Sequence, residues 1–258
     1  MSENIPRVHP GSASNRFISM QPPRSLRLRG EFGEAESFSA GTPRAKSWLR
    51  GTLEGFRRRF ARERRRRKVG RAYDMALEIA RVIPKGSAVL DVGCGNGYIA
   101  HHLSAMLGTP LVGIDLTDAT DAPIDYRQYD GVQFPVADCS VDALLFCYVL
   151  HHAQDIGTMM NEARRVLRDE GLVVVYEDIP QTWWDKGACW IHNRQWKGRT
   201  GPSMFRVEDE WRALFRFCGF EIVSQRQLSR WRNLTHPVTR RFCLLRKSQI
   251  HRACPQGC

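Results

Sequence analysis

The residues best spaced for chemistry form a glycine-rich turn after an apolar run. Residues 88–92 are strand-like and contain Asp91, and glycines follow at alternate positions, Gly93, Gly95 and Gly97. Glycines let the backbone pass close to a ligand and adopt positive φ, and the amides of the helix expected beyond the turn can donate to a polar ligand. An acid at the strand end is badly placed for a pyrophosphate and well placed for an ammonium group. The pattern therefore favours an amino-acid-bearing cofactor over a dinucleotide.

A second acid follows the next apolar stretch. Residues 111–114 predict a strand that ends at Asp115, about 20 residues beyond the glycine turn. An acid at this position accepts hydrogen bonds from ribose hydroxyls in nucleotide-binding βαβ units. A cap or turn role, shared with Thr117 and Asp118, is the structural alternative. The spacing favours the ribose interpretation.

These motifs resemble those of the class I S-adenosylmethionine-dependent methyltransferases, specifically the methyltransferase type 11-like group, and the resemblance continues over residues 88–178. It implies S-adenosylmethionine as the cofactor. It also implies an α/β fold with a Rossmann-like, doubly wound, mostly parallel seven-stranded sheet whose last strand is antiparallel. The later strands are expected at residues 124–127, 143–148, 172–176, 220–223 and 239–245.

The resemblance extends to individual cofactor residues. Asp130 matches the acid that binds the adenine amino group in the family, and Gly131 allows close approach. Residues 116–123 are expected to form a loop where most members have a helix, which leaves the adenine side more open. At the end of the fourth strand, Cys147 and Tyr148 are expected beside the methionine part. The complete predicted cofactor set is Asp91, Gly93, Cys94, Gly95, Asn96, Asp115, Leu116, Asp130, Gly131, Cys147 and Tyr148.

The acceptor side is expected beyond the fourth and fifth strands, because ligands bind at the carboxyl ends of parallel strands. His151 and His152 lie there, but the family often has these histidines whatever the substrate, which favours capping and packing over catalysis. Residues 181–204 are predicted to form a substrate lid, with ordinary core packing as the alternative. Its predicted substrate contacts are Trp183, Trp184, Trp190, His192 and Trp196, and the candidates for a catalytic base are His192, Glu177 and Asp178.

Charge divides the chain into regions. The 258 residues carry a net charge of +12, of which residues 1–71 hold +12, residues 72–180 hold −10 and residues 181–258 hold +10. The excess positive charge therefore lies outside the predicted methyltransferase domain, residues 72–258. Within that domain the cofactor half is acidic and the acceptor half is basic, which suits an acceptor with an acidic group.

The N-terminal segment has two textures. Residues 1–47 are rich in Ser, Pro, Gly and Arg and are predicted to be a disordered basic tail. Residues 48–71 are predicted to form a basic amphipathic helix, in which Phe56 and Phe60 share a face and arginines crowd the rest from residue 57 to 68. The apolar face is expected to cover the catalytic domain. The alternatives are an anionic membrane surface or the phosphates of a nucleic acid.

Several classes are excluded. No apolar run approaches the roughly 20 residues that span a bilayer, and the opening residues lack the apolar core of a secretory signal. The eight cysteines are scattered, as expected of reduced thiols, so a cytoplasmic location is predicted, with peripheral attachment at a membrane as an extension. Cys254 and Cys258 lack a second ligand pair, so no metal site is predicted.

The expected function is methyl transfer to oxygen, nitrogen or carbon of a small-molecule or lipid acceptor. After the fourth strand the chain reads Phe-Cys-Tyr-Val at residues 146–149, unlike the Asn/Asp-Pro-Pro-Tyr/Phe tetrapeptide of similar enzymes that methylate amino groups of DNA and protein. One alternative is an RNA methyltransferase that uses the N-terminal arginine-rich segment. A second is a non-catalytic interaction module on the same fold. The sequence makes no prediction of oligomeric state.

Overall fold

The structure is a computed structural model that describes residues 43–200, 202–232 and 236–248. The chain divides into two compact units, residues 1–52 and 53–258. Of the first unit, residues 43–52 are described, and they belong to helix α1 (Pro43–Ile79). Most of the predicted tail, residues 1–47, and the cysteines at 254 and 258 lie outside the described residues. The second unit holds the sheet and the candidate site.

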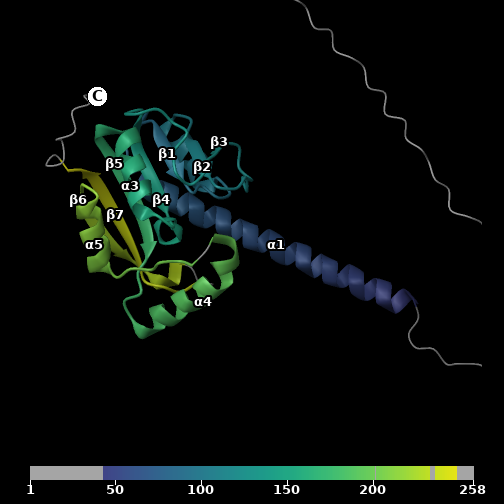
Figure 1. Cartoon of the computed structure of the whole chain (residues 1–258). Helices are drawn as coiled ribbons and strands as arrows, with labels where there is room; N and C mark the ends of the chain where they lie inside the picture. Colours follow the sequence, from purple (N-terminus) through teal and green to yellow (C-terminus); the bar gives the residue numbers. More distant parts are fainter. Residues whose placement is uncertain (1–42, 201, 233–235, 249–258) are drawn as a thin grey trace, which may run out of the picture. The chain divides into compact units, whose positions relative to one another are not determined.

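Seven strands form one mixed sheet in the order β3-β2-β1-β4-β5-β7-β6 (Figure 1). The strands are β1 (Val89–Val92), β2 (Val112–Asp115), β3 (Asp125–Gln128), β4 (Val141–Cys147), β5 (Leu167–Asp178), β6 (Phe220–Leu228) and β7 (Arg240–Lys247). The first five are mutually parallel, and β7 pairs antiparallel with both β5 and β6. The predicted fold class is therefore confirmed.

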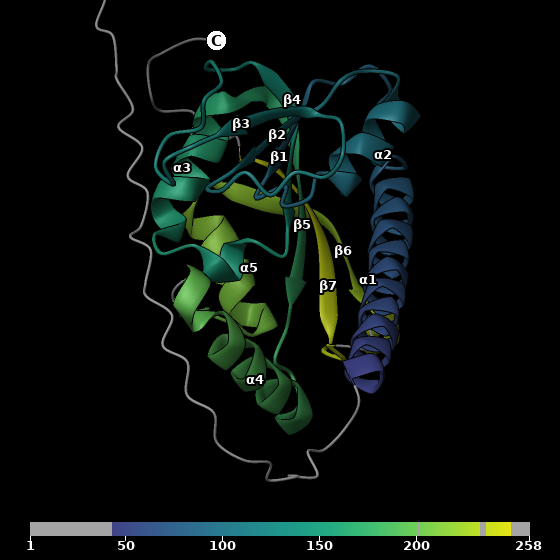
Figure 2. The same ribbon diagram turned by 90° about the vertical axis from the view of Figure 1, so that its right-hand side faces the viewer.

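Helices cover both faces of this sheet. Besides α1, the helices are α2 (Tyr98–Leu107), α3 (Ile156–Val166), α4 (Trp183–Thr200) and α5 (Glu208–Phe217), with short 3-10 turns η1 (Leu150–His152) and η2 (Arg230–Arg232). Figure 2 shows α3 and α5 on one side of the sheet and α2 with the C-terminal part of α1 on the other.

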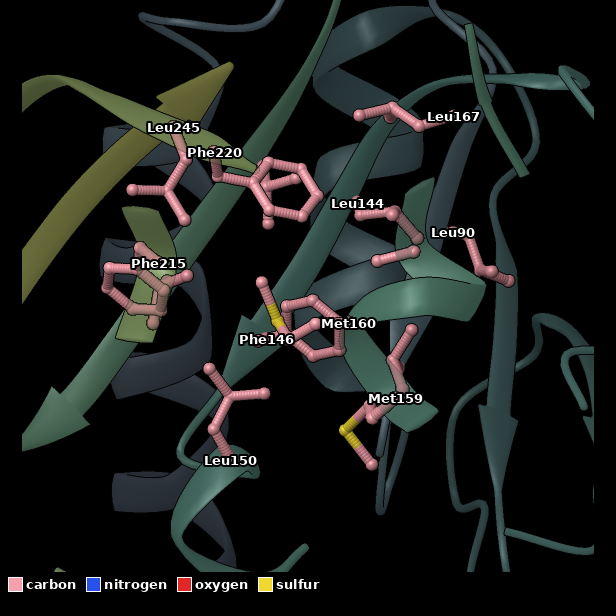
Figure 3. Packing of buried hydrophobic residues seen from close by; sticks show 14 of the residues in the cluster. Leu90, Leu144, Phe146, Leu150, Met159, Met160, Leu167, Phe215, Phe220 and Leu245 are labelled. Carbon is pink, nitrogen blue, oxygen red and sulfur yellow. The ribbon is translucent and has the colours of Figure 1, made fainter. Parts of the chain in front are cut away.

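The central strands are apolar on both sides because both faces are covered. Along β4, Leu144 and Phe146 pack with α3 and α5, whereas Ala143 and Leu145 pack with α1 and α2. Figure 3 shows Phe146 against Met160 in the first of these clusters. This two-sided burial fixes the register of the strands and thereby the positions of the residues at their carboxyl ends.

Helix α1 is one continuous element that extends beyond both ends of the basic helix predicted at residues 48–71. Its C-terminal part is buried through Ala72, Ala76 and Ile79. The side chains of Phe56 and Phe60, by contrast, are 72% and 64% exposed. The prediction that the apolar face covers the domain is therefore wrong for these two phenylalanines, because the helix contacts the domain only further along, among the described side chains.

Most of the segment predicted as a substrate lid, residues 181–204, forms helix α4. The predicted loop at residues 116–123 is confirmed. Of the described cysteines, Cys94, Cys147, Cys189, Cys218 and Cys243 are free. Within the described part of the chain, no helix combines the length and apolarity that crossing a membrane requires.

Candidate cofactor and acceptor site

The glycine turn between β1 and α2 has the geometry that the sequence predicts. Gly93 has φ 69°, and a Cβ at this position would lie 2.4 Å from Val149 Cγ2, so only glycine fits there. Gly95 has φ 54°, and nothing lies within 4 Å of where its Cβ would be. The turn is therefore tightly packed on one side and leaves open space on the other, where a ligand can approach the backbone.

Asp91 is the most unusual charged residue of this turn. Its side chain is 1% exposed, and neither carboxylate oxygen has a hydrogen-bond partner among the described residues. Burial, reinforced by the charge of Asp115, raises the pKa of Asp91 to about 7. A buried carboxylate without a partner is costly, and the ammonium group of a bound amino acid would satisfy it. The orphaned carboxylate and the open space at Gly95 thus fit an amino-acid-bearing nucleoside.

Asp115 lies at the end of β2 and faces the same turn. Its Oδ2 accepts a hydrogen bond of 2.9 Å from the Gly95 amide, and its Oδ1 accepts one of 3.4 Å from the Thr117 amide. The cap role and the ribose role are therefore compatible, since a carboxylate can accept about four hydrogen bonds. The assignment to ribose stays a prediction.

Asp130 occupies an analogous position after β3. Its Oδ1 accepts hydrogen bonds from the amides of Val132 and Gln133, at 2.8 and 3.0 Å, and these bonds lower the pKa of its carboxyl group. Asp130, Tyr129 and Phe134 are among the residues that line a wide, open groove. The groove is consistent with the prediction that a loop at residues 116–123, in place of a helix, leaves the adenine side of the site open.

Four further residues of the predicted set complete this part of the site. Asn96 Nδ2 donates to the Ala119 carbonyl, which ties the turn to the loop after β2. The Cys94 side chain lies against Gly113, where a Cβ would be 2.9 Å from its Sγ, and burial raises its pKa. Leu116 is 49% exposed, and its Cδ2 lies 3.2 Å from where a Cβ of Gly131 would be. These contacts place Cys94 and Asn96 against β2 and the loop that follows it, and Leu116 against Gly131.

Helix α1 brings cations to this rim that the sequence pattern did not assign to the site. Lys68 Nζ donates to Asn96 Oδ1, and Arg65 Nε donates to Tyr98 Oη at 2.8 Å. Burial, followed by the nearby Arg240, lowers the pKa of Arg71. The charge pattern assigned these residues to a basic helix outside the methyltransferase domain. The sequence feature that could have revealed their role is that the basic run continues directly into the buried part of the helix, which begins at Ala72.

Tyr148 turns the chain sharply at the end of β4. It is a non-glycine residue with φ 62°, a conformation that costs about 1–3 kcal/mol and concentrates at functional sites. Its amide donates to the Tyr176 carbonyl at 2.9 Å, which holds the turn against β5. Burial raises the pKa of the preceding Cys147, and the charges of Asp91 and Glu177 add to the effect. Cys147 therefore lies between the cofactor turn and the acceptor side.

Beyond this turn, a histidine is held by a buried carboxylate. His151 Nδ1 lies 2.6 Å from Glu177 Oε2, and Glu177 Oε1 accepts a hydrogen bond of 2.8 Å from the Leu150 amide. His151 is 1% exposed and Glu177 is 2% exposed. Burial opposes protonation of His151, but the adjacent Glu177 carboxylate outweighs it and raises the pKa of the imidazole.

Two more histidines join His151 to form what we call the histidine cluster, His151, His152 and His192. The ring centroid of His151 lies 4.1 Å from that of His152 and 5.5 Å from that of His192. Burial, followed by the neighbouring histidines, lowers the pKa of His152 to about 3 and that of His192 to about 4. Both are therefore neutral imidazoles at neutral pH. The preference for mere packing at residues 151 and 152 did not anticipate this convergence.

Two of the three candidate bases, Glu177 and Asp178, are already engaged with other side chains. Glu177 holds His151, and Asp178 Oδ2 lies 3.0 Å from His236 Nε2 while its Oδ1 lies 3.0 Å from Arg240 Nε. Both carboxylates therefore position other side chains. His192 retains a buried Nε2 without a hydrogen-bond partner among the described residues, and its assignment as a base stays a prediction.

The predicted aromatic contacts separate into two groups. Trp196 stacks on His192, with ring centroids 5.9 Å apart and planes at 19°, and lies 5.9 Å from His152. Trp183, Trp184 and Trp190 are 80%, 51% and 63% exposed. Of the predicted substrate contacts, His192 therefore belongs to the histidine cluster and Trp196 packs beside it. The other three tryptophans lie on the exposed side of α4.

A doubly wound sheet with this glycine turn and acids at two strand ends defines a Rossmann-like nucleoside-binding domain. Residues 90–175 match a family model described as a methyltransferase domain. The chain is 34% identical over 97 residues to a probable S-adenosylmethionine-dependent methyltransferase of Mycolicibacterium smegmatis, which is 35% of this chain and 37% of that protein. It is 28% identical over 102 residues to a ubiquinone biosynthesis O-methyltransferase of Azorhizobium caulinodans, 35% of this chain and 40% of that protein.

Among solved structures, an S-adenosylmethionine-dependent methyltransferase from Methanosarcina mazei aligns with a TM-score of 0.54 and 19% identity, covering 66% of this chain and 96% of that one. The chain thus spans about 40% of the length of the two curated relatives above. Residues 90–175 thus match the methyltransferase domain family, and the resemblance to class I S-adenosylmethionine-dependent methyltransferases seen in the sequence is confirmed. Family and fold together imply S-adenosylmethionine as the cofactor.

Proposed function

We propose that this protein transfers the methyl group of S-adenosylmethionine to a small-molecule or lipid acceptor. The observation that carries the proposal is the buried Asp91 carboxylate, which lacks a hydrogen-bond partner among the described residues and lies in a turn with open space at Gly95. Such a carboxylate is well suited to bind the ammonium group of the cofactor of a methyltransferase.

The residues that would hold the cofactor follow from the chemistry of its parts. Asp91 would bind the ammonium group, Asp115 the ribose hydroxyls and Asp130 the adenine amino group. The half-buried guanidinium of Arg71 carries the charge that the methionine carboxylate requires. The cofactor supplies the electrophilic methyl group, and the chain positions the acceptor beside it.

In the transfer, the bond between sulfur and methyl breaks as a bond from methyl to the acceptor atom forms. The sulfonium thereby becomes a neutral thioether, and an oxygen or nitrogen acceptor gives up a proton. The histidine cluster and Trp196 would line the acceptor side, where an aromatic surface suits a planar or apolar acceptor. A relative whose name places it in ubiquinone biosynthesis supports an acceptor of this kind.

Labelled cofactor provides the test. The full chain incubated with methyl-labelled S-adenosylmethionine and a lipid and metabolite extract should transfer label to the extract, and Asp91→Asn should abolish transfer. Asp74→Asn is the matched control, because Asp74 is an exposed residue of α1 and this variant should be fully active. Label recovered in RNA would favour an RNA acceptor instead, and no transfer with intact cofactor binding would favour the interaction module.

We further propose that the exposed part of α1 attaches the protein peripherally to an anionic membrane surface. From residue 54 to 68 every described side chain is exposed, so Phe56 and Phe60 stand beside a dense run of arginines. Exposed aromatic residues among cations are typical of helices that lie in a lipid interface. The protein should bind vesicles that contain anionic lipid and not neutral vesicles, and salt-sensitive binding to RNA alone would contradict the proposal.

A further inference from the structure

We propose that His151, His152 and His192 form a binding site for a divalent transition-metal ion, of the class of Zn²⁺ or Co²⁺. Each residue offers one ring nitrogen, and the three atoms lie within 4.8 Å of one another. Imidazole nitrogens lie about 2.0–2.1 Å from a bound zinc ion, so small ring rotations bring three such atoms onto one ion. The sequence predicted no metal site, and residue 192 is too far along the chain for any ligand spacing to show one.

The contacts of His151 hold its ring in an orientation suited to binding a metal ion. Its Nδ1 contacts the Glu177 carboxylate at 2.6 Å, which assigns the Nδ1 proton to that bond and leaves the lone pair on Nε2. That Nε2 is buried and has no hydrogen-bond partner among the described residues. Histidines that bind metals commonly donate their other ring N–H to a carboxylate in this way, which fixes the tautomer and the ring orientation.

The other two rings are also held in place. His192 presents a second buried Nε2 that lacks a hydrogen-bond partner in the described part of the chain, and Trp196 stacks on its ring. His152 Nδ1 lies 3.2 Å from Ser203 Oγ. Phe205 stacks on His151 with ring centroids 4.7 Å apart. Imidazole nitrogens are ligands that zinc and similar ions accept.

A fourth histidine supports the cluster from outside. The ring centroid of His236 lies 4.9 Å from that of His192, and its Nε2 contacts Asp178 Oδ2 at 3.0 Å. Because its Nε2 is engaged with Asp178, we treat His236 as a neighbour of the cluster and not as a fourth ligand. Three protein ligands and an open position are the arrangement of catalytic zinc sites.

The open position would face the acceptor, because the cluster lies at the carboxyl ends of β4 and β5, the sheet edge that also carries Asp91. An ion there would bind an acceptor hydroxyl and make its proton easier to remove. This role rests on the proposed methyl transfer. It would explain why Glu177 and Asp178, the candidate bases, are both engaged with histidines.

Cobalt binding tests the site independently of methyl transfer. The full chain without an affinity tag, stripped with chelator and titrated with Co²⁺ alone, should show one equivalent of the strong visible absorption of tetrahedral cobalt. His192→Ala and the more conservative His192→Gln should both lose it. Glu177→Gln should weaken Co²⁺ affinity by about 10-fold or more. His101→Ala, an exposed histidine on α2, is the matched control and should bind as the wild type.

Binding of S-adenosylhomocysteine is measured in the same samples. If His192→Gln binds S-adenosylhomocysteine but not Co²⁺, the variant is folded and the metal site is supported. If wild-type protein binds S-adenosylhomocysteine but no Co²⁺, or if His192→Gln keeps the tetrahedral absorption, the metal site is overturned while the proposed function stands. If Co²⁺ binds as expected and S-adenosylhomocysteine does not, the metal site stands and the proposed function fails.

Discussion

Asp91→Asn should stabilise the ligand-free protein while it removes cofactor binding. The substitution keeps the shape of the side chain and deletes the buried charge. Burial, with the charge of Asp115, raises the pKa of Asp91 from 3.8 to about 7. At 1.36 kcal/mol for each factor of ten in the proton-binding constant, that rise corresponds to roughly 4 kcal/mol of destabilisation when the carboxylate is fully ionised.

The stability gained by Asp91→Asn should depend on pH in a direction that can be measured. The folded-state pKa lies above the unfolded value, so the unfolded chain releases the proton first, and the Asp91 contribution to stability falls as pH rises from about 4 to about 7. Asparagine has no such dependence. The stability gained by Asp91→Asn should therefore be greatest at pH 8, at most roughly 4 kcal/mol, and should fall to less than half of that at pH 5.

Urea unfolding followed by tryptophan fluorescence measures this gain, with Asp74→Asn as the control that should leave stability unchanged at both pH values. With saturating S-adenosylhomocysteine the stability gained by Asp91→Asn should shrink, because the ligand would stabilise the wild type more than it stabilises the variant. The reasoning is refuted if Asp91→Asn is no more stable than the wild type at pH 8, or if its gain is the same at pH 5 and pH 8.

Three further variants test other parts of the structure. Gly93→Ala should destabilise the fold by about 2–4 kcal/mol in urea unfolding, because its Cβ would clash with Val149 at a backbone with positive φ; a change below 1 kcal/mol would contradict the packing of this turn. Arg71→Ala should weaken S-adenosylhomocysteine binding by about 10-fold in calorimetry, whereas unchanged affinity would exclude Arg71 from the cofactor site. Replacing both Phe56 and Phe60 with serine should leave the melting temperature unchanged, since both are exposed, and should lower vesicle binding in co-sedimentation; undiminished binding would exclude these rings from the interface.

Much of the fold could be predicted because its signals are local. The apolar strands, the glycine turn and the acids at strand ends each occupy a few consecutive residues. Helix α4 could not be predicted, because Gly187 and Gly198 suggested a loop. Nothing lies within 4 Å of where a Cβ at either glycine would be, so both sit at unpacked helix positions, where glycine costs only about 1 kcal/mol relative to alanine. The packing of His192 and Trp196 on the cluster helps to offset that cost.

The site divides in the same way. The predicted cofactor residues at β1 and β2 follow from local motifs, and the structure brings Asp91, Gly95 and Asp115 together at one edge of the sheet. The histidine cluster joins residues from η1 and α4, which are about 40 positions apart, and its supporting Glu177 comes from β5. Such a cluster is created by the tertiary fold alone. The cations of α1 were missed for a related reason, since the charge pattern separated an N-terminal helix that the fold makes continuous with the domain.

Calorimetric titration of the full chain with S-adenosylhomocysteine tests the central claim most directly. The wild type should bind one equivalent, Asp74→Asn should bind equally well, and Asp91→Asn and Asp115→Ala should bind at least about 10-fold more weakly. No binding by the wild type, or undiminished binding by Asp91→Asn, would contradict the assignment of this site to S-adenosylmethionine.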